Sequence, residues 1–324
     1  MQRTLFSILV VLLSLTLLAS LAQAQTYPKK PIELIVPHAP GAATDAGARI
    51  IAPYLSEKWG VPVSVVNKPG GNGIPGTLDV MKSAPDGYTM LMDGHSTNTM
   101  LAAAVKELPA ELGLRTAVVK AFMVPVFYIV KADVPWKTLA EAIEAARKNP
   151  MNFKWGAGTL GSIDNFSQTR LFQVAGIDSG AGRVTFDKGH APALQALLGG
   201  HVQFGIGMMP DIKSLYPSKI RALAVTAPER IKAFPDIPTS KEAGFAEANV
   251  VGWYGVSGPP KLPDEIISVW EKTLANAAND FTFQERAAKV GHLIRFVPRK
   301  EMVVELEKEY KIYLDIAEKT GLRR

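Results

Sequence analysis

The chain has 324 residues, of which 47% are hydrophobic and 20% charged, with a formal net charge of +6 and no cysteine. This balance excludes a wholly disordered chain, and the lack of cysteine excludes disulfides, thiolate nucleophiles and cysteine-bound zinc. Lysine and arginine are scattered without aromatic-basic interleaving, so the composition does not favour a nucleic-acid partner.

The first 24 residues have the pattern of a cleaved export signal. Arg3 precedes an almost wholly apolar run, Leu5 to Leu18, and Ala22-Gln23-Ala24 forms a small-residue cleavage site. The apolar run is shorter than the roughly 20 residues that a membrane span needs. We expect the signal to occupy residues 1–24 and the mature chain to reside in the periplasm.

The next segment predicts a strand, a bare turn and a helix. Ile32 to Val36 is a short apolar run, and a helix is expected from near Thr44 towards Trp59. Prolines, glycine and alanines leave the turn's backbone exposed, while Thr44 and Asp45 are residue types that cap helices. A helix N-terminus attracts a carboxylate or phosphate when no large side chains cover the preceding turn. An ordinary capped turn that binds no ligand is an equally good interpretation of this stretch.

Strands and helices alternate along the rest of the chain. Further strands are expected at 61–66, 88–92, 117–130, 152–155, 183–186, 202–206, 221–226 and 250–256. Helices are expected at 77–82, from Thr138, at 163–174, from Pro192, from Pro263 and at 299–319. In the last helix, we expect an inward stripe of Val303, Leu306, Tyr310, Leu314 and Ala317. This order predicts an α/β fold with mostly parallel sheets, which bind ligands beyond the carboxyl ends of strands.

The segment Gly156 to Gly161 fits the spacing G-x-G-x-x-G between a predicted strand and a predicted helix. In dinucleotide-binding enzymes this loop cradles a pyrophosphate, with an acidic residue, here Asp187, on the ribose. An NAD(P)-dependent oxidoreductase is therefore an alternative, although Asp187 lies further along than is usual. A second helix-end anion site, with the hydroxyls of Thr159 and Ser162 beside backbone N–H groups, is the more economical interpretation.

The five histidines show no spacing typical of a metal site, so no metal or cofactor is predicted. His38, His95 and His190 each follow a predicted strand end. We expect them to contact the ligand and to make its affinity depend on pH near neutrality. No nucleophile elbow or carboxylate pair indicates catalysis.

Several longer motifs occur in a fixed order along the chain. They are Ile35-Val36-Pro37 with Pro40-Gly41 and Thr44-Asp45, Asn67-Lys68-Pro69-Gly70-Gly71-Asn72-Gly73, Ala84-Pro85-Asp86-Gly87-Tyr88, Leu197-Leu198-Gly199-Gly200, Pro235-Asp236-Ile237-Pro238-Thr239 and Trp253-Tyr254-Gly255. Together they resemble the substrate-binding proteins of tripartite tricarboxylate transporters, the Bug family. The resemblance covers most of the mature chain.

This resemblance implies a two-lobed periplasmic binding protein of the type II kind, with two crossover strands. Lobe 1 would comprise residues 26–125 plus 252–324, and lobe 2 residues 126–251. Such a protein closes on a small organic carboxylate and delivers it to a membrane permease, as a monomer without catalysis or a cofactor. A sensor subunit that binds ligand for a signalling partner is a further alternative.

In the family, the turn 37–45 and the loop 158–162 hold the carboxylate from opposite lobes, largely through backbone N–H groups. The resemblance and the loop positions together predict ligand contacts from His38, Pro40, Gly41, Ala42, Ala43, Thr44, Asp45, Asn72, His95, Ser96, Gly158, Thr159, Gly161, Ser162, Asn165, His190 and Met208.

The chain departs from the family pattern inside this predicted site. His38 replaces a usual aromatic residue, Ala42 a usual glycine, and Asn165 a common histidine. Many members also carry an aspartate after the strand at 202–205, where this chain has Ile206-Gly207-Met208-Met209. We therefore expect a pocket suited to an apolar or extended acid rather than to an amino group.

Overall fold

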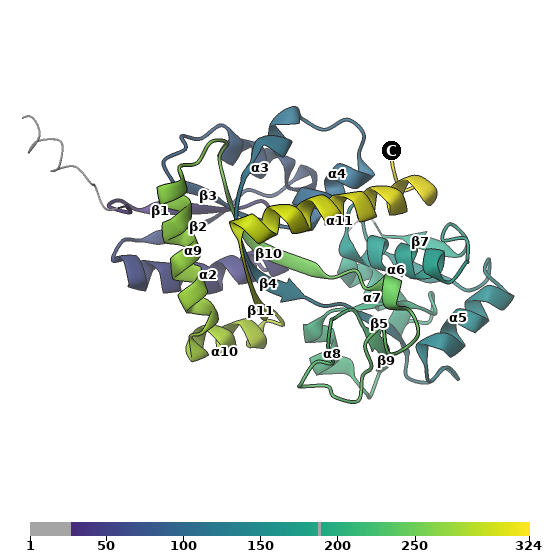
Figure 1. Cartoon of the computed structure of the whole chain (residues 1–324). Helices are drawn as coiled ribbons and strands as arrows, with labels where there is room; N and C mark the ends of the chain where they lie inside the picture. The colour runs from purple at the N-terminus through teal and green to yellow at the C-terminus, as the bar shows by residue number, and fades with distance from the viewer. Residues whose placement is uncertain (1–26, 187–188) are drawn as a thin grey trace, which may run out of the picture.

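The computed structural model describes residues 27–186 and 189–324, so the expected export signal and Asp187 lie outside the described residues. The elements form two groups, one around a six-stranded sheet and one around two smaller sheets, and α11 crosses from one group towards the other (Figure 1). We call the first group lobe 1 and the second lobe 2. No helix of the described part is long and apolar enough to cross a membrane.

Lobe 1 is a sheet with the strand order β11-β4-β10-β3-β1-β2 and helices on its faces. The strands are β1 (Ile32–Val36), β2 (Val63–Asn67), β3 (Thr89–Gly94), β4 (Thr116–Val124), β10 (Gly252–Gly258) and β11 (Leu293–Pro298). The helices are α2 (Ala43–Trp59), α3 (Ile74–Met81), α4 (Leu101–Ala104), α9 (Asp264–Ala278), α10 (Phe281–Lys289) and α11 (Arg299–Lys319). Lobe 1 also contains short helical turns at η1 (Gly71–Gly73), η2 (Ser96–Met100) and η3 (Ala110–Leu114).

Lobe 2 holds a three-stranded sheet, β8-β5-β9, and the strand pair β6-β7. Its strands are β5 (Phe127–Lys131), β6 (Trp155–Ala157), β7 (Arg183–Thr185), β8 (Gly205–Gly207) and β9 (Ile220–Val225). Its helices are α5 (Leu139–Lys148), α6 (Ile163–Val174), α7 (His190–Leu198) and α8 (Met209–Leu215), with the short turn η4 (Ala246–Ala248) near its end.

The α/β layering agrees with the prediction, but the sheets are mixed rather than mostly parallel. Strand β1 pairs in parallel with β2 and β3, whereas β10 runs antiparallel to both β3 and β4. Strand β5 runs antiparallel to β8 and β9. The cause is the chain path: β4 leads out of lobe 1 into β5, and the neighbouring β10 returns, so the two strands run in opposite directions.

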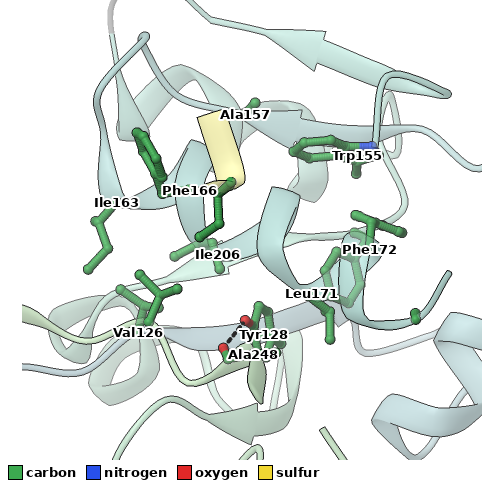
Figure 2. Packing of buried hydrophobic residues seen from close by; sticks show 14 of the residues in the cluster. Val126, Tyr128, Trp155, Ala157, Ile163, Phe166, Leu171, Phe172, Ile206 and Ala248 are labelled. Carbon is green, nitrogen blue, oxygen red and sulfur yellow. Dashed lines mark hydrogen bonds between the residues drawn. The ribbon is translucent and has the colours of Figure 1, made fainter. Parts of the chain in front are cut away.

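The largest apolar cluster surrounds α6 and includes Phe166, Tyr128 of β5, and Trp155 and Phe172, whose ring centroids lie 5.1 Å apart (Figure 2). The Tyr128 hydroxyl donates to the carbonyl oxygen of Ala248 at 2.9 Å, so its polar end is also satisfied. The cluster continues into lobe 1 through residues of α4 and α11. A continuous apolar contact therefore connects the lobes on this side.

Helix α11 is fixed to the lobe 1 sheet by a buried cation. Lys120 of β4 is fully buried; its ammonium contacts Glu305 at 2.9 Å and also Glu309, while the indole of Trp253 donates to Glu309 at 2.8 Å. This network orients Glu305 and Glu309 of α11 towards the sheet. The predicted inward stripe is consequently wrong at Val303, which is 40% exposed. The buried residues of α11 are Met302, Tyr313, Ile316 and the predicted Ala317, and the predicted Leu306, Tyr310 and Leu314 are partly buried against the core.

Candidate functional site

The turn between β1 and α2 presents backbone donors at a helix N-terminus. Ala42 is the N-cap residue, and the first intrahelical bond runs from the Ala46 N–H to the Ala42 carbonyl at 2.9 Å. The N–H groups of Ala43, Thr44 and Asp45 precede that bond and point out of the helix end. His292 Nε2 lies 2.9 Å from the carbonyl oxygen of Ala43 and so holds this end in place.

The predicted capping role of Thr44 and Asp45 is wrong, because α2 begins one residue earlier than its predicted start. The Asp45 carboxylate folds back and accepts from the Gly41 N–H at 2.9 Å, Arg49 Nε at 2.8 Å and Asn67 Nδ2 at 2.9 Å. Burial alone would raise the pKa of Asp45, but these three donors lower it overall. Asp45 therefore braces the turn, and it leaves the helix-end N–H groups to another acceptor.

Two histidines stand beside this turn in a neutral form. His95 is buried, with Nδ1 3.0 Å from both the nitrogen and the oxygen of Trp253. Burial lowers the pKa of His95 to about 4, and burial also lowers the pKa of His38 although the charge of Asp93 opposes that shift. Among the described residues, His38 Nδ1 is buried without a hydrogen-bond partner.

The loop before α6 forms the corresponding part of lobe 2. Ser162 is the N-cap and accepts from the Asn165 N–H at 3.3 Å, while Asn165 Nδ2 reaches the Gly158 carbonyl at 3.4 Å. Gly161 has a φ of +81°, which permits the sharp turn into the helix. Asn165 thus stabilises the helix start, and its buried amide is committed to the loop itself.

His190 joins three helix N-termini in lobe 2. Its Nδ1 lies 2.8 Å from the carboxylate of Asp164 on α6, and its Nε2 lies 2.8 Å from the carboxylate of Asp211 on α8. Asp211 also accepts from the Met208 N–H at 2.7 Å, so Met208 contributes its backbone as the N-cap of α8. Burial alone would lower the pKa of His190, but the two carboxylates raise it to about 10.

For His95 and His190, these pKa values contradict the expectation that the loop histidines make ligand affinity depend on pH near neutrality. The pKa of His95 lies well below this range and that of His190 well above it, while that of His38 is also lowered. His38 and His95 are therefore neutral and His190 is charged at pH 7.

The lobe 1 and lobe 2 parts meet at β10. A Cβ added at Gly252 would lie 2.8 Å from His95 Cε1 and 2.9 Å from Ile163 Cδ1, so the first residue of α6 faces His95. Two residues further on, Tyr254 has a pKa that burial raises to about 12, with Thr44 opposing and the charge of Asp164 adding to the shift. The N-termini of α2 and α6 thus converge on one segment of β10.

The remaining predicted residues differ in exposure. Pro40 and Asn72 are exposed, Ser96 and Thr159 are half-buried, and Asn72 adopts a positive φ of 54° within η1. Asp164, Asp211, Tyr254 and His292 were not among the predicted contacts. Asp164 could have been found from its place two residues after the Ser162 cap, in the first turn of α6, but His292 and Tyr254 reach the site only through the tertiary fold.

Two cavities of the described structure lie outside this cluster. A cavity of about 630 Å³ lies between η2 and α11, near Val303 and Arg323, and one of about 610 Å³ lies beside β9, near Tyr216 and Arg221. In the described ranges, no group of three or more His, Cys, Asp or Glu residues is placed to hold a metal ion. The convergence of helix N-termini is therefore the feature that identifies the candidate site.

The glycines that fit the dinucleotide spacing serve this loop in a different way. A Cβ at Gly158 would lie 2.7 Å from Ser162 Oγ, and the Gly156 carbonyl accepts from Gln168 Nε2 at 2.6 Å. The absence of a side chain at Gly158 leaves room for the Ser162 hydroxyl, and the Gly156 carbonyl is occupied by a side chain of α6. Asp187, the expected ribose contact, lies outside the described residues.

Comparisons with known proteins agree on one family. Residues 47–296 match the family described as tripartite tricarboxylate transporter family receptor. Protein BugT of Bordetella pertussis is 31% identical over 279 residues, which cover 85% of this chain and 84% of BugT. A structure of an R. palustris protein with adipate has a TM-score of 0.79 and 27% identity, covering 91% of this chain and 98% of that one. MatC from Rhodopseudomonas palustris with bound malate has a TM-score of 0.74 and 25% identity, covering 90% and 99%. The chain belongs to the tripartite tricarboxylate transporter receptor family, as its motifs predict.

Proposed function

We propose that this protein is a periplasmic solute-binding receptor that captures a small organic carboxylate between its two lobes without transforming it. The captured acid is delivered to a membrane permease of the tripartite tricarboxylate type. Lobe 1 comprises residues 26–125 plus 252–324 and lobe 2 residues 126–251, and the export signal occupies residues 1–24.

The observation that carries this proposal is the convergence of the N-termini of α2 and α6 beside β10. The N–H groups of Ala43 and Thr44 precede the first intrahelical bond of α2, and the positive end of the helix dipole adds to their attraction for an anion. The adipate and malate bound to two structural relatives are small carboxylates of this kind.

Closure of the two lobes on the ligand follows from the position of the α2 and α6 N-termini in different lobes. The chain passes between lobes through the links β4–β5 and β9–β10, while the donors of α2 belong to lobe 1 and those of α6 to lobe 2. Only a closed arrangement brings both sets to one ligand. A bound acid therefore favours the closed state by its additional contacts there.

A thermal-shift screen of the mature chain tests this function. Mono-, di- and tricarboxylates, aromatic acids, amino acids, NAD and NADP are compared, and a ligand at about 100 times its Kd adds about 2.7 kcal/mol to stability. We expect one class of acids to raise the melting temperature by several degrees. Ala42→Leu, which places bulk at the N-cap of α2, abolishes the shift, whereas Ala140→Leu on the exposed face of α5 preserves it.

Other outcomes of the screen contradict the proposal. A shift with NAD or NADP alone supports a cofactor loop at Gly156 to Gly161 and an oxidoreductase. A shift with acids that Ala42→Leu leaves intact places the site elsewhere in the molecule. A receptor that pairs with a signalling protein instead of a permease is distinguished by reconstituted uptake, which requires the permease.

A further inference from the structure

The two lobes meet at a second place, where α8 of lobe 2 contacts the turn between α10 and β11 of lobe 1. In Figure 1, α11 passes above β10, whereas α8 and α10 lie below it. Lys213 of α8 donates from its ammonium group to the carbonyl oxygen of Ala288 at 2.7 Å, near the end of α10. Leu293, the first residue of β11, packs against the lobe 2 cluster that contains Met209. We call this meeting of α8 with residues 288–292 the α8 contact.

Gly291 is the residue of the turn that comes closest to α8. Its φ is +84°, and a Cβ added there would lie 2.6 Å from the Cβ of Met209 and 3.2 Å from the Cδ of Pro210. Met209 and Pro210 are the first two residues of α8. Glycine is therefore the residue that permits this approach, and any side chain at position 291 must push the start of α8 away from the turn.

The same turn ends at His292, whose ring contacts the first turn of α2. His292 is 2% exposed, and its Nε2 lies 2.9 Å from the carbonyl oxygen of Ala43. Burial lowers the pKa of His292, so the ring is neutral at pH 7; because a carbonyl oxygen only accepts, Nε2 carries the proton. Among the described residues, Nδ1 is buried without a hydrogen-bond partner. The polar contact of this ring is thus directed at the helix end that offers donors to the ligand.

On the lobe 2 side, α8 is connected to α6 through His190. Asp211 of α8 and Asp164 of α6 each lie 2.8 Å from one nitrogen of that ring. Hydrogen bonds and close packing therefore run from the start of α6 through α8 and the 288–292 turn to the start of α2. The N-termini of α2 and α6 are in this way joined by the protein itself, in addition to any ligand between them.

We propose that the α8 contact forms when the lobes close, and that it couples closure to carboxylate affinity because His292 then positions the N-terminus of α2. This inference rests on the proposed function, in which the lobes close on a carboxylate. Opening separates α8 from Gly291 and Ala288, which leaves the turn that carries His292 without its lobe 2 support. The contact consequently slows ligand release. His292 is a positioning residue, since it acts on the ligand through the first turn of α2.

Isothermal titration calorimetry at pH 7.5 tests the positioning role. The probes are adipate and malate, the acids bound to two relatives, and each acid that raises the melting temperature in the screen. His292→Phe keeps a ring beside Phe122 and Tyr254, whose centroids lie 5.2 Å and 5.3 Å from that of His292, but it removes the donor to Ala43. We expect the affinity to fall about tenfold.

His292→Gln is the conservative variant that separates positioning from packing. Its side-chain amide again offers an N–H group to the Ala43 carbonyl, so we expect an affinity close to that of the wild type. If His292 served packing alone, phenylalanine would be the better replacement in these apolar surroundings. His292→Phe would then bind more tightly than His292→Gln, and this order would overturn the positioning role.

Gly291→Ala tests the contact with α8. The added methyl group has no room against Met209, so we expect the dissociation rate of the acid, measured by stopped-flow tryptophan fluorescence, to rise about tenfold. Gly244→Ala is the matched control. Gly244 also has a positive φ, of +91°, but within the described structure a Cβ there would have no neighbour within 4 Å. Its dissociation rate should equal that of the wild type.

Lys213→Met tests the same contact without straining the backbone. Lys213 is exposed, so its replacement does not endanger folding, and the loss of the donor to Ala288 should raise the dissociation rate by a smaller factor than Gly291→Ala. Lys219→Met, at an exposed lysine just beyond α8, should leave the rate unchanged. Unchanged rates in both Gly291→Ala and Lys213→Met overturn the coupling while leaving carboxylate capture intact. If no acid binds the wild type, carboxylate capture fails and the coupling fails with it.

Discussion

His190 is the residue on which three helix N-termini of lobe 2 depend. It begins α7, and its ring nitrogens contact a carboxylate of α6 and one of α8, each at 2.8 Å. Two carboxylates at helix N-termini are favourable in themselves, but so close together they require the cation between them. The histidine is therefore a structural ion at neutral pH.

Removing this cation should be costly. His190→Ala leaves Asp164 and Asp211 facing each other, and we expect it to lower the free energy of unfolding by about 3 to 5 kcal/mol at pH 7. Urea denaturation followed by circular dichroism measures the loss. His201→Ala, at an exposed histidine of the same lobe, is the control and should change stability little. Equal stability of the two variants would contradict this role.

The same residue predicts how stability changes with pH. The pKa of His190 is raised in the folded state to about 10, above its unfolded value near 6.5. Its contribution is therefore complete below pH 6.5 and is lost as the pH rises through about 10. We expect the stability of the wild type to fall between pH 7 and 10 relative to His190→Ala, which lacks this contribution. A constant difference between the two would argue against a protonated His190.

At the scale of elements, β10 lies between β3 and β4 and passes close to the N-termini of α2 and α6. A Cβ at Gly255 would lie 2.1 Å from the carbonyl oxygen of Val119 and 2.8 Å from the Cα of Lys120. Both are backbone atoms of β4, and the register shifts between Tyr254 and Gly255. The strand thus approaches its neighbour at a bulge that leaves no room for a side chain.

Gly255→Ala should consequently destabilise the protein by about 2 to 3 kcal/mol, because β10 must move away from β4. Gly205→Ala in β8 is the matched control, since its Cβ would find Leu197 side-chain atoms at 3.8 Å and 3.9 Å, an ordinary contact. Denaturant unfolding of both variants gives the comparison. A Gly255→Ala variant as stable as Gly205→Ala would show that β10 can shift freely.

Sequence patterns predict elements well where local chemistry is strong. The Thr138 cap begins α5 as expected, accepting from the Glu141 N–H at 3.2 Å, and α6 spans the predicted residues 163–174. Helices α8 and α10 and strand β11, which have seven, nine and six residues, were not predicted. In the predicted stripe of α11, Ala317 is buried and Leu306, Tyr310 and Leu314 pack against the core, but Val303 is exposed.

The whole molecule is joined along α11, which contacts β4 in lobe 1 and α6 in lobe 2. Tyr313 of this helix is buried and meets Phe166 of α6 edge to face, with ring centroids 5.3 Å apart. The pair belongs to the apolar cluster that extends from the lobe 2 core into α4. Unfolding of the lobes should therefore be coupled through this contact.

Tyr313→Ala tests the coupling. We expect a loss of about 3 to 5 kcal/mol, as for large aromatic truncations in cores, and a calorimetric transition that broadens or splits in two. Tyr313→Phe keeps the ring packing and should retain a single transition close to that of the wild type. Two lobes that melt together in Tyr313→Ala would place the coupling elsewhere.

The sequence predicted the loops of the candidate site better than it predicted the residues that contact those loops from distant parts of the chain. Glycine, proline and capping residues mark the turn before α2 and the loop before α6 because they act locally. The pKa values of His38, His95 and His190 depend on burial and on carboxylates distant in sequence, so the strand-end pattern alone predicted the wrong titration range. The positions of Tyr254 and His292 at the site also depend on contacts between residues that are distant in sequence.

The place of β10 between β3 and β4 also governs the order in which the sheet can assemble as the chain is made from its N-terminus. Strands β1 to β4 come out first, but β4 has no partner among them, because the residues that separate it from β3 in the sheet arrive after position 251. The three-stranded sheet of lobe 2 spans only residues 127–225 and can close earlier. Lobe 1, whose first strands are synthesised first, is thus completed last. Until β10 is added, the edges of β3 and β4 are unpaired and can be bound by chaperones or by other chains in aggregation.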